Sequence, residues 1–228
     1  MLVLFQIVVF LFSIGVHESA HAYAAMRLGD PTAYMLGRVT LNPARNIDPW
    51  GSILMPALSF LFGGMLVGWG KPVPVTLRNF RKIKRDDMLS TGAGLASHLA
   101  LAVIALGLLV GLKHYPGVGG SAVVAAMRMV NHDASVDMTQ LPQLFPIALL
   151  LYYFVTINVM LFVFNLVPVP PLDGSRFIRY ALSYNAEKVY DRIGMLGSFL
   201  IFFVAMRIVF PLVFAPLITA FNVLLLSL

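Results

Sequence analysis

The chain has 228 residues, of which 59% are hydrophobic and 11% charged, with a mean hydropathy of +0.86, and this excludes a water-soluble domain and indicates a polytopic membrane protein. The formal net charge is +6, but the basic residues flank apolar stretches, so they indicate membrane topology and argue against a nucleic-acid partner. Cysteine is absent, which excludes disulfides and thiolate ligands and leaves His, Asp and Glu to hold any metal ion.

An apolar helix is expected from about residue 2 to 28, and three ionisable side chains lie in its C-terminal half, His17, Glu18 and His21. Residues four apart lie on one face of a helix, so both imidazoles can bind one metal ion. This is the His-Glu-x-x-His pattern of zinc hydrolases, in which the glutamate reaches a water molecule and is not itself a ligand. An ionisable residue at the centre of a bilayer costs about 2.5–3.5 kcal/mol on insertion scales, so three together indicate a function.

Two other interpretations of this stretch compete. Ala20-His21-Ala22 resembles the cleavage site of a signal peptide, but the N-terminus has no basic region and the apolar helix continues to Leu28. The motif could also be a coincidence, with both histidines satisfied by structural partners. A third ligand elsewhere in the chain would argue against that interpretation.

The rest of the chain predicts an all-α polytopic membrane protein with about five to six apolar helices. Residues 32–48 and 71–75 lack helical periodicity and predict short β-strands, which could offer an edge strand to a substrate. Residues 49–70 are uncharged but contain Pro56 and a Gly63-Gly64 pair, where the chain can bend. We expect this segment to be re-entrant or interfacial, although its length would allow an ordinary span.

Further spanning helices are expected at residues 88–112 and 141–165. The C-terminal segment 193–228 is apolar apart from Arg207. Two prolines, at 211 and 216, divide it into one span and a second span or an interfacial helix. The whole chain, residues 1–228, is expected to form a single membrane-embedded domain.

A third metal ligand is expected at Asp173. The chain has ten acidic residues, and only Glu18 and Asp173 lie within or at the end of a long apolar stretch. Prolines at 168, 170 and 171 exclude a helix before Asp173, and irregular backbone at membrane depth is tolerated only where it is buried or lines a wet cavity. Leu172-Asp173-Gly174 could instead be a plain turn at the membrane surface, but the histidine pair that lacks a third ligand favours a metal-binding role.

These motifs resemble those of the site-2 protease family of intramembrane zinc metalloproteases. His17-Glu18-Ser19-Ala20-His21 matches the first motif, and Asn165-Leu-Val-Pro-Val-Pro-Pro-Leu-Asp173-Gly174 matches the second. Residues 37–43, 47–49 and 70–75 look like the compact bacterial and archaeal branch without a regulatory domain. The resemblance covers about residues 10–185, which would form the zinc-site core.

By this resemblance, His17, His21 and Asp173 bind one Zn²⁺ ion and Glu18 is the general base. Asn165 would position the substrate or the oxyanion. The chain would then be an intramembrane endopeptidase that hydrolyses peptide bonds in or near the transmembrane segments of other membrane proteins. Its partners would be such a substrate and the lipid bilayer, and a homo-oligomer stays open.

One departure from the family pattern concerns the central span. The family carries a Gly-Pro-x-x-Asn-like motif there, and this chain has Gly94-Leu95-Ala96-Ser97-His98. His98 could donate a hydrogen bond to the substrate, be an extra metal ligand, or be a histidine satisfied by a neighbouring helix. We keep it as a further candidate catalytic residue.

The two zinc motifs must meet at one depth, so the helices that carry them must run in the same direction. Arg27, Arg176 and Arg179 then lie on one side of the membrane, and if residues 88–112 and 141–165 each cross once, the basic cluster at 78–85 lies there too. Basic loops mark the cytoplasmic side, so we expect an integral protein of a prokaryotic cell membrane with its active site towards the cytoplasm. Three alternatives remain: a metallopeptidase that cuts outside the membrane, a metal-binding transporter, and a catalytically inactive scaffold.

Overall fold

The computed structural model of the chain describes residues 2–61, 68–133, 136–137, 139–192, 197, 208 and 210–228. The longer helices in these ranges are α1 (Leu2–Leu28), α4 (Ile83–Lys113), α5 (Gly119–Val130), α6 (Phe145–Asn165) and α10 (Ala215–Ser227). The shorter helical elements are α2 (Thr32–Met35), η1 (Pro43–Arg45), η2 (Pro49–Leu54), α3 (Met55–Leu61), η3 (Leu77–Asn79), α7 (Gly174–Arg179), α8 (Tyr184–Arg192) and η4 (Phe210–Phe214).

Helices α1, α4 and α6 are long and apolar enough to cross a membrane, and they pack against one another. Their buried side chains join one core that includes Phe10, Leu109 and Tyr152. On the outer face of α4, Val103 and Ile104 are 66% and 60% exposed, as expected of a surface that faces lipid. Together these features place the protein in a membrane.

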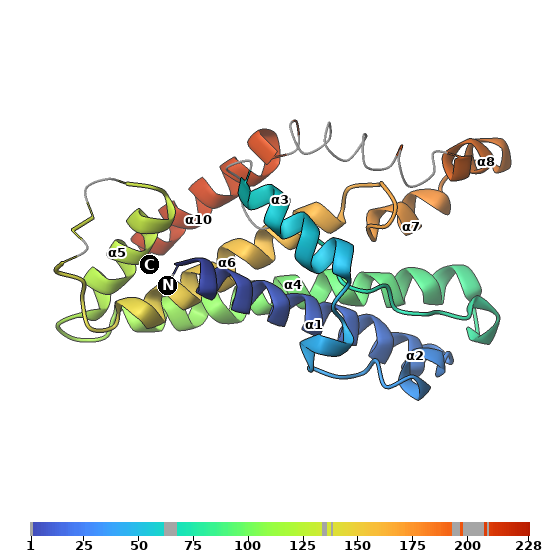
Figure 1. Ribbon diagram of the computed structural model, residues 1–228, viewed down its shortest axis with the longest axis horizontal. Coiled ribbons are helices and arrows are strands. Elements are labelled where there is room, and N and C mark those ends of the chain that lie inside the picture. The colour runs from blue at the N-terminus through green and yellow to red at the C-terminus, as the bar shows by residue number, and fades with distance from the viewer. Residues whose placement is uncertain are drawn as a thin grey trace.

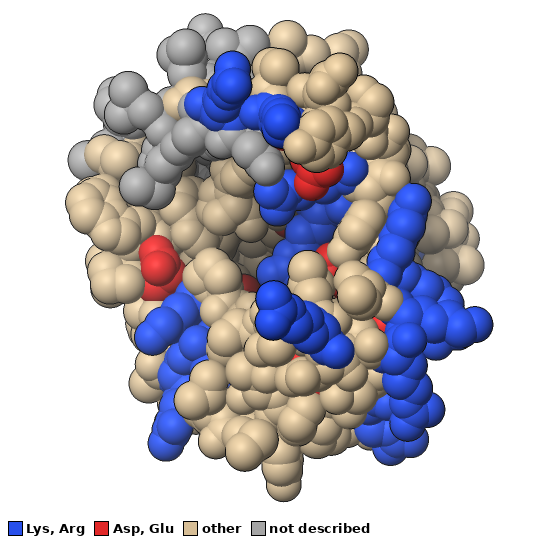
Figure 2. All heavy atoms as spheres, turned by 90° about the vertical axis from the view of Figure 1, so that its right-hand side faces the viewer, with Lys and Arg blue, Asp and Glu red and all other residues tan. Residues whose placement is uncertain are grey.

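The direction of the three helices positions the candidate ligands. In Figure 1, α1 and α6 run the same way and α4 runs in the opposite direction. The C-terminal half of α1 therefore lies at the same end of the bundle as the chain that follows α6. Figure 2 looks onto this end and shows Lys and Arg side chains gathered around a hollow.

The end of α1 is defined by glycine. Gly29 has φ of 115°, which L side chains rarely adopt, and the Asp30 amide donates to the carbonyl oxygen of Ala25 at 2.9 Å. This is a Schellman-type C-cap, which satisfies carbonyl groups at the helix end. Asp30 then accepts hydrogen bonds from the Thr76 amide at 2.7 Å and from the Asn79 side chain at 2.8 Å, so it ties the end of α1 to the segment that precedes α4.

The predicted short β-strands near residues 32–48 and 71–75 are wrong: the described residues contain no strand. Residues 32–48 form α2 and η1, and Asn42 caps η1 by accepting a hydrogen bond from the Ala44 amide. Residues 71–75 have neither helix nor strand, and Pro72 and Pro74 have no N–H group to donate to a ladder. An edge strand for the substrate therefore has no basis in these segments.

The sequence predicts about five to six apolar helices, and the described residues contain three of spanning length and two shorter ones. Helix α5 and the stretch Leu212–Ser227 are apolar but have fewer than 18 residues, whereas a span needs about 20. Most of residues 193–209, where a further span is predicted, lies outside the described residues.

The two described ends of segment 49–70 lie together. The Trp69 amide donates to the Gly51 carbonyl at 3.2 Å, and the Ser52 hydroxyl donates to the Trp69 carbonyl at 2.8 Å. A segment that enters and leaves on one side has its ends in contact in this way. The re-entrant prediction also covers residues 62–67, which lie outside the described residues.

Candidate metal centre

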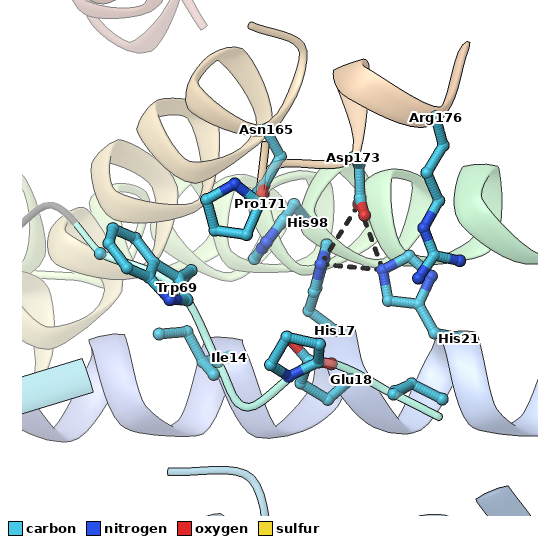
Figure 3. A pocket seen from close by; sticks show the side chains of 14 residues that line it. Ile14, His17, Glu18, His21, Trp69, His98, Asn165, Pro171, Asp173 and Arg176 are labelled. Atoms are coloured by element: carbon cyan, nitrogen blue, oxygen red, sulfur yellow. Dashed lines mark hydrogen bonds and ion pairs between the residues drawn. The ribbon is translucent and has the colours of Figure 1, made fainter. Parts of the chain in front are cut away.

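Three candidate ligands meet between α1 and the chain after α6. The Nε2 atoms of His17 and His21 are 2.9 Å apart, and they lie 3.3 Å and 3.1 Å from Oδ2 of Asp173 (Figure 3). All three residues are buried. The i, i+4 spacing on α1 produces the imidazole pair, as the sequence predicts.

The positions of these atoms fit a metal ion. His21 Nδ1 lies 2.8 Å from the Ser90 carbonyl oxygen, which can only accept, so Nδ1 carries the proton and Nε2 of neutral His21 has a lone pair. Oδ2 of Asp173 is buried and has no hydrogen-bond donor among the described residues. Two acceptors 3.1 Å apart repel unless a cation lies between them. Ligands of a tetrahedral zinc ion with bonds of about 2.0–2.1 Å are roughly 3.3 Å apart, so the group is positioned to bind zinc.

Asp173 reaches the histidines because the chain turns back at the end of α6. The turn, in which the Pro170-Pro171 peptide bond is cis, returns Gly174 to the end of α6. A Cβ atom on Gly174 would lie 2.3 Å from the Leu166 carbonyl oxygen, so the close approach requires glycine.

Helix α7, which begins immediately after Asp173, is anchored to α4 by Asp87. Arg176 Nη1 lies 3.4 Å from Oδ1 of Asp87, and the Tyr180 hydroxyl donates to Oδ2 at 2.9 Å. Burial and the Asp87 carboxylate raise the pKa of Tyr180 to about 12, so the phenol keeps the proton that it donates. The anchor holds in place the turn that carries Asp173.

Glu18 lies beside the ligand group in a cavity of about 40 Å³, which is large enough for about two water molecules. The side chain is buried, and the backbone after Trp69 lies directly over it: a Cβ atom on Gly70 would be 2.5 Å from Oε1 of Glu18. The cavity is lined by Ile14, His17, Glu18, His21, Gly68, Trp69, Gly70, Pro72, Val73, His98, Asn165, Pro171, Asp173 and Arg176. A carboxylate therefore faces a water-sized space next to the metal-binding atoms (Figure 3).

The structure brings the two remaining candidates to the same cavity. Asn165 is buried, and its amide nitrogen donates to the Leu161 carbonyl at 2.9 Å. This bond uses one N–H of the amide and does not use the second. The His98 ring stacks on the His17 ring with centroids 4.6 Å apart. His98 is not part of the group of three ligands found among the described residues.

Sequence reasoning misses Trp69, Gly70 and Arg176 as cavity residues. Gly70 lies in a segment whose family resemblance is recognised, and Arg176 follows Asp173 by three positions. The sequence alone does not show that the Gly70 backbone or the Arg176 side chain reaches the metal centre. Their positions depend on how segment 49–70 and α7 pack.

Comparison with known proteins agrees with this geometry. The chain matches peptidase family M50 over residues 5–208. It is 38% identical over 174 residues to the "Putative zinc metalloprotease YwhC" of Bacillus subtilis (strain 168). The aligned residues cover 76% of this chain and 67% of that protein. It is 36% identical over 98 residues to the "Putative zinc metalloprotease Rip2" of Mycolicibacterium smegmatis, and this alignment covers 43% of this chain and 37% of that protein. No solved structure gives a significant match.

Proposed function

The chain belongs to peptidase family M50, and on this premise we propose that it is an intramembrane endopeptidase that cuts other membrane proteins in or near their transmembrane segments. The family and the relatives confirm the resemblance to site-2 proteases, and with it a zinc metalloprotease that acts on peptides or proteins. The location of the cut within the bilayer, the roles of single residues and the orientation in the membrane are parts of the proposal.

The observation that carries the proposal is the depth of the metal centre. His17 is eleven residues before the end of α1 at Leu28, which at 1.5 Å per residue is about 16 Å along the helix. The hydrocarbon core of a bilayer is about 30 Å thick, so this residue lies well inside a helix of spanning length. Peptide bonds that reach the centre therefore belong to a chain within or close to the membrane.

The proposed chemistry assigns one task to each polar residue. His17, His21 and Asp173 would hold a zinc ion, which when bound supplies a Lewis acid for the peptide carbonyl and for water. Glu18 would take the proton from the attacking water and pass it to the leaving amine, since its carboxylate faces the same cavity.

Asn165 would act on the substrate. One N–H of its amide is used by the Leu161 carbonyl, and the second is available to a substrate oxygen in the cavity. Removal of a single donor to a developing oxyanion typically costs about 100- to 1,000-fold in kcat.

We further propose that the centre lies towards the cytoplasmic side of a prokaryotic cell membrane. The end of the bundle at which α1 and α6 finish carries the gathered Lys and Arg side chains (Figure 2). Basic residues are concentrated in cytoplasmic loops of membrane proteins. The relative from Bacillus subtilis supports a bacterial context.

The test compares zinc content and cleavage in wild type and Glu18→Gln. The probes are a labelled single-span peptide in liposomes and a water-soluble peptide with the same central sequence. We expect the wild type to cut the spanning peptide much faster than the soluble one, and Glu18→Gln to bind equal zinc without cutting. A preference for the soluble peptide would favour a cut outside the membrane, and full activity in Glu18→Gln would exclude this residue as the base.

A further inference from the structure

His98 has one ring nitrogen that the fold does not use. Its side chain is 1% exposed, and Nε2 is buried without a hydrogen-bond partner among the residues described. Burial of a donor or acceptor without a partner is unfavourable, so such an atom in a cavity is a candidate to bind a ligand. The proposed mechanism above makes no use of it.

Neighbouring groups determine which nitrogen of His98 carries the proton. The side-chain amide of Asn158 lies 2.8 Å from the Phe154 carbonyl oxygen, which can only accept, so the atom that faces it is the amide nitrogen. The same nitrogen donates to the Ser13 hydroxyl at 3.0 Å.

The opposite end of the Asn158 amide is therefore the oxygen, and it lies 2.9 Å from Nδ1 of His98. Nδ1 must donate to it. In neutral His98 the free Nε2 is consequently a lone pair, and the residue can accept a hydrogen bond at this atom but cannot donate one.

This acceptor lies beside the metal centre. The His98 ring stacks on the His17 ring with an interplanar angle of 22°, and His98 lines the cavity that also contains Glu18 and Asn165 (Figure 3). A peptide that brings its carbonyl to this centre brings its neighbouring N–H groups close to His98.

We propose that Nε2 of His98 accepts a hydrogen bond from a backbone N–H of the substrate next to the cut bond. A helical substrate must unwind to expose its carbonyl, and an N–H freed from the helix in an apolar setting is unfavourable unless an acceptor replaces the carbonyl it lost. His98 supplies that acceptor, and Asn158 and Ser13 fix its polarity. The inference deepens the proposed function and rests on it.

The first experiment measures which ring nitrogen of His98 carries the proton, and it does not depend on activity. The chain has five histidines, so ¹⁵N NMR of protein with ring-labelled histidine gives few signals, and the His98 pair is the one that disappears in His98→Gln. We expect a protonated Nδ1 and a lone-pair Nε2. Addition of a spanning peptide with a central Asn-Gly pair to the Glu18→Gln variant should shift the Nε2 signal towards that of a hydrogen-bonded acceptor. A protonated Nε2, or no shift on peptide binding, would overturn the proposal.

The second experiment uses the reach of the replacing side chain. Gln places its carbonyl oxygen near the position of Nε2, and Asn does not reach beyond that of Nδ1. We expect His98→Gln to keep zinc and to stay within about threefold of wild-type KM, and His98→Asn to keep zinc but raise KM about tenfold or more with little change in kcat. His114→Gln, at an exposed histidine after α4, is the matched control.

The outcomes separate the two proposals. If wild type cuts no spanning peptide, the proposed function fails, while the NMR result still tests the polarity and the contact. If wild type is active and His98→Asn matches His98→Gln in KM, the reach argument is wrong and this inference fails alone. Loss of zinc in His98→Gln would mean that His98 supports the metal centre instead, and would also overturn the inference.

Discussion

Gly94 of α4 lies so close to His21 of α1 that a Cβ atom on Gly94 would be 2.2 Å from Nε2 of His21. The same atom would lie 2.8 Å from the His17 ring. Helix α4 therefore closes one side of the metal centre with bare backbone, and the histidines have room to converge only because position 94 has no side chain.

Gly94→Ala should weaken zinc binding by at least about tenfold, the size of effect typical when the support of a ligand is lost. The added methyl group must displace an imidazole that is held by the Ser90 carbonyl. The matched control is Gly92→Ala on the same helix, where a Cβ atom meets nothing within 4 Å. Zinc titration of both purified variants checks this, and equal affinities would contradict the packing described here.

Asp87→Asn should raise the zinc dissociation constant by about threefold to tenfold, less than the 10- to 100-fold typical of residues that bond a ligand directly. Asp87 acts indirectly: it binds Arg176 and Tyr180, which follow Asp173 in the chain, and so supports the position of Asp173. Asp137→Asn, in an exposed loop, is the control. Unchanged zinc affinity in Asp87→Asn would show that the turn holds Asp173 without this anchor.

Asp30→Asn should lower the free energy of unfolding at pH 7 by about 1–3 kcal/mol, because an amide group would face the backbone and side-chain N–H donors that the carboxylate now accepts from. Burial raises the pKa of the Asp30 carboxyl, but hydrogen bonds from Thr32, Asn79 and Thr76 outweigh it, so the folded-state pKa lies below the ordinary 3.8.

A lowered folded-state pKa gives stability that is fully present above 3.8 and is lost as the pH falls through the folded-state value. Thermal unfolding of metal-free protein in detergent, at pH 7 and at steps below pH 4, should therefore show the difference between wild type and Asp30→Asn shrink at low pH. A difference that stays constant or grows on acidification would contradict the assignment.

Single cysteines at Ala44 and Leu77 should be labelled from the same side of the membrane. Both positions are exposed, and the natural chain has no cysteine to interfere. The hydrogen bond between the Trp69 amide and the Gly51 carbonyl holds the described ends of segment 49–70 together, which predicts that both ends lie on one side. Labelling from opposite sides would mean that this segment crosses the bilayer.

The convergence of His17, His21 and Asp173 could be predicted from the sequence because each residue carries a local signal. The spacing of His17 and His21 fixes one helix face, and the prolines before Asp173 exclude a helix that would turn its carboxylate away. The roles of Gly94 and Gly70 could not be predicted, since a glycine gives no sign of which side chain packs against it.

The errors in the fold prediction have a related cause. Residues 71–75 have the extended character expected of a strand, but two prolines deprive the segment of the donors that a strand partner needs. A second span or an interfacial helix is predicted at the C-terminus, and the described apolar stretch Leu212–Ser227 is too short for a span. Local sequence indicates the secondary structure that a segment favours, but not the segments against which it packs.

The central claim is that Asp173 and the histidine pair of α1 hold one metal ion, and the most direct test is the zinc content per chain of wild type and Asp173→Ala. We expect one zinc ion per chain in the wild type and substoichiometric zinc in Asp173→Ala after identical purification, while Glu18→Gln keeps one. One tightly bound zinc ion per chain in Asp173→Ala would contradict the account.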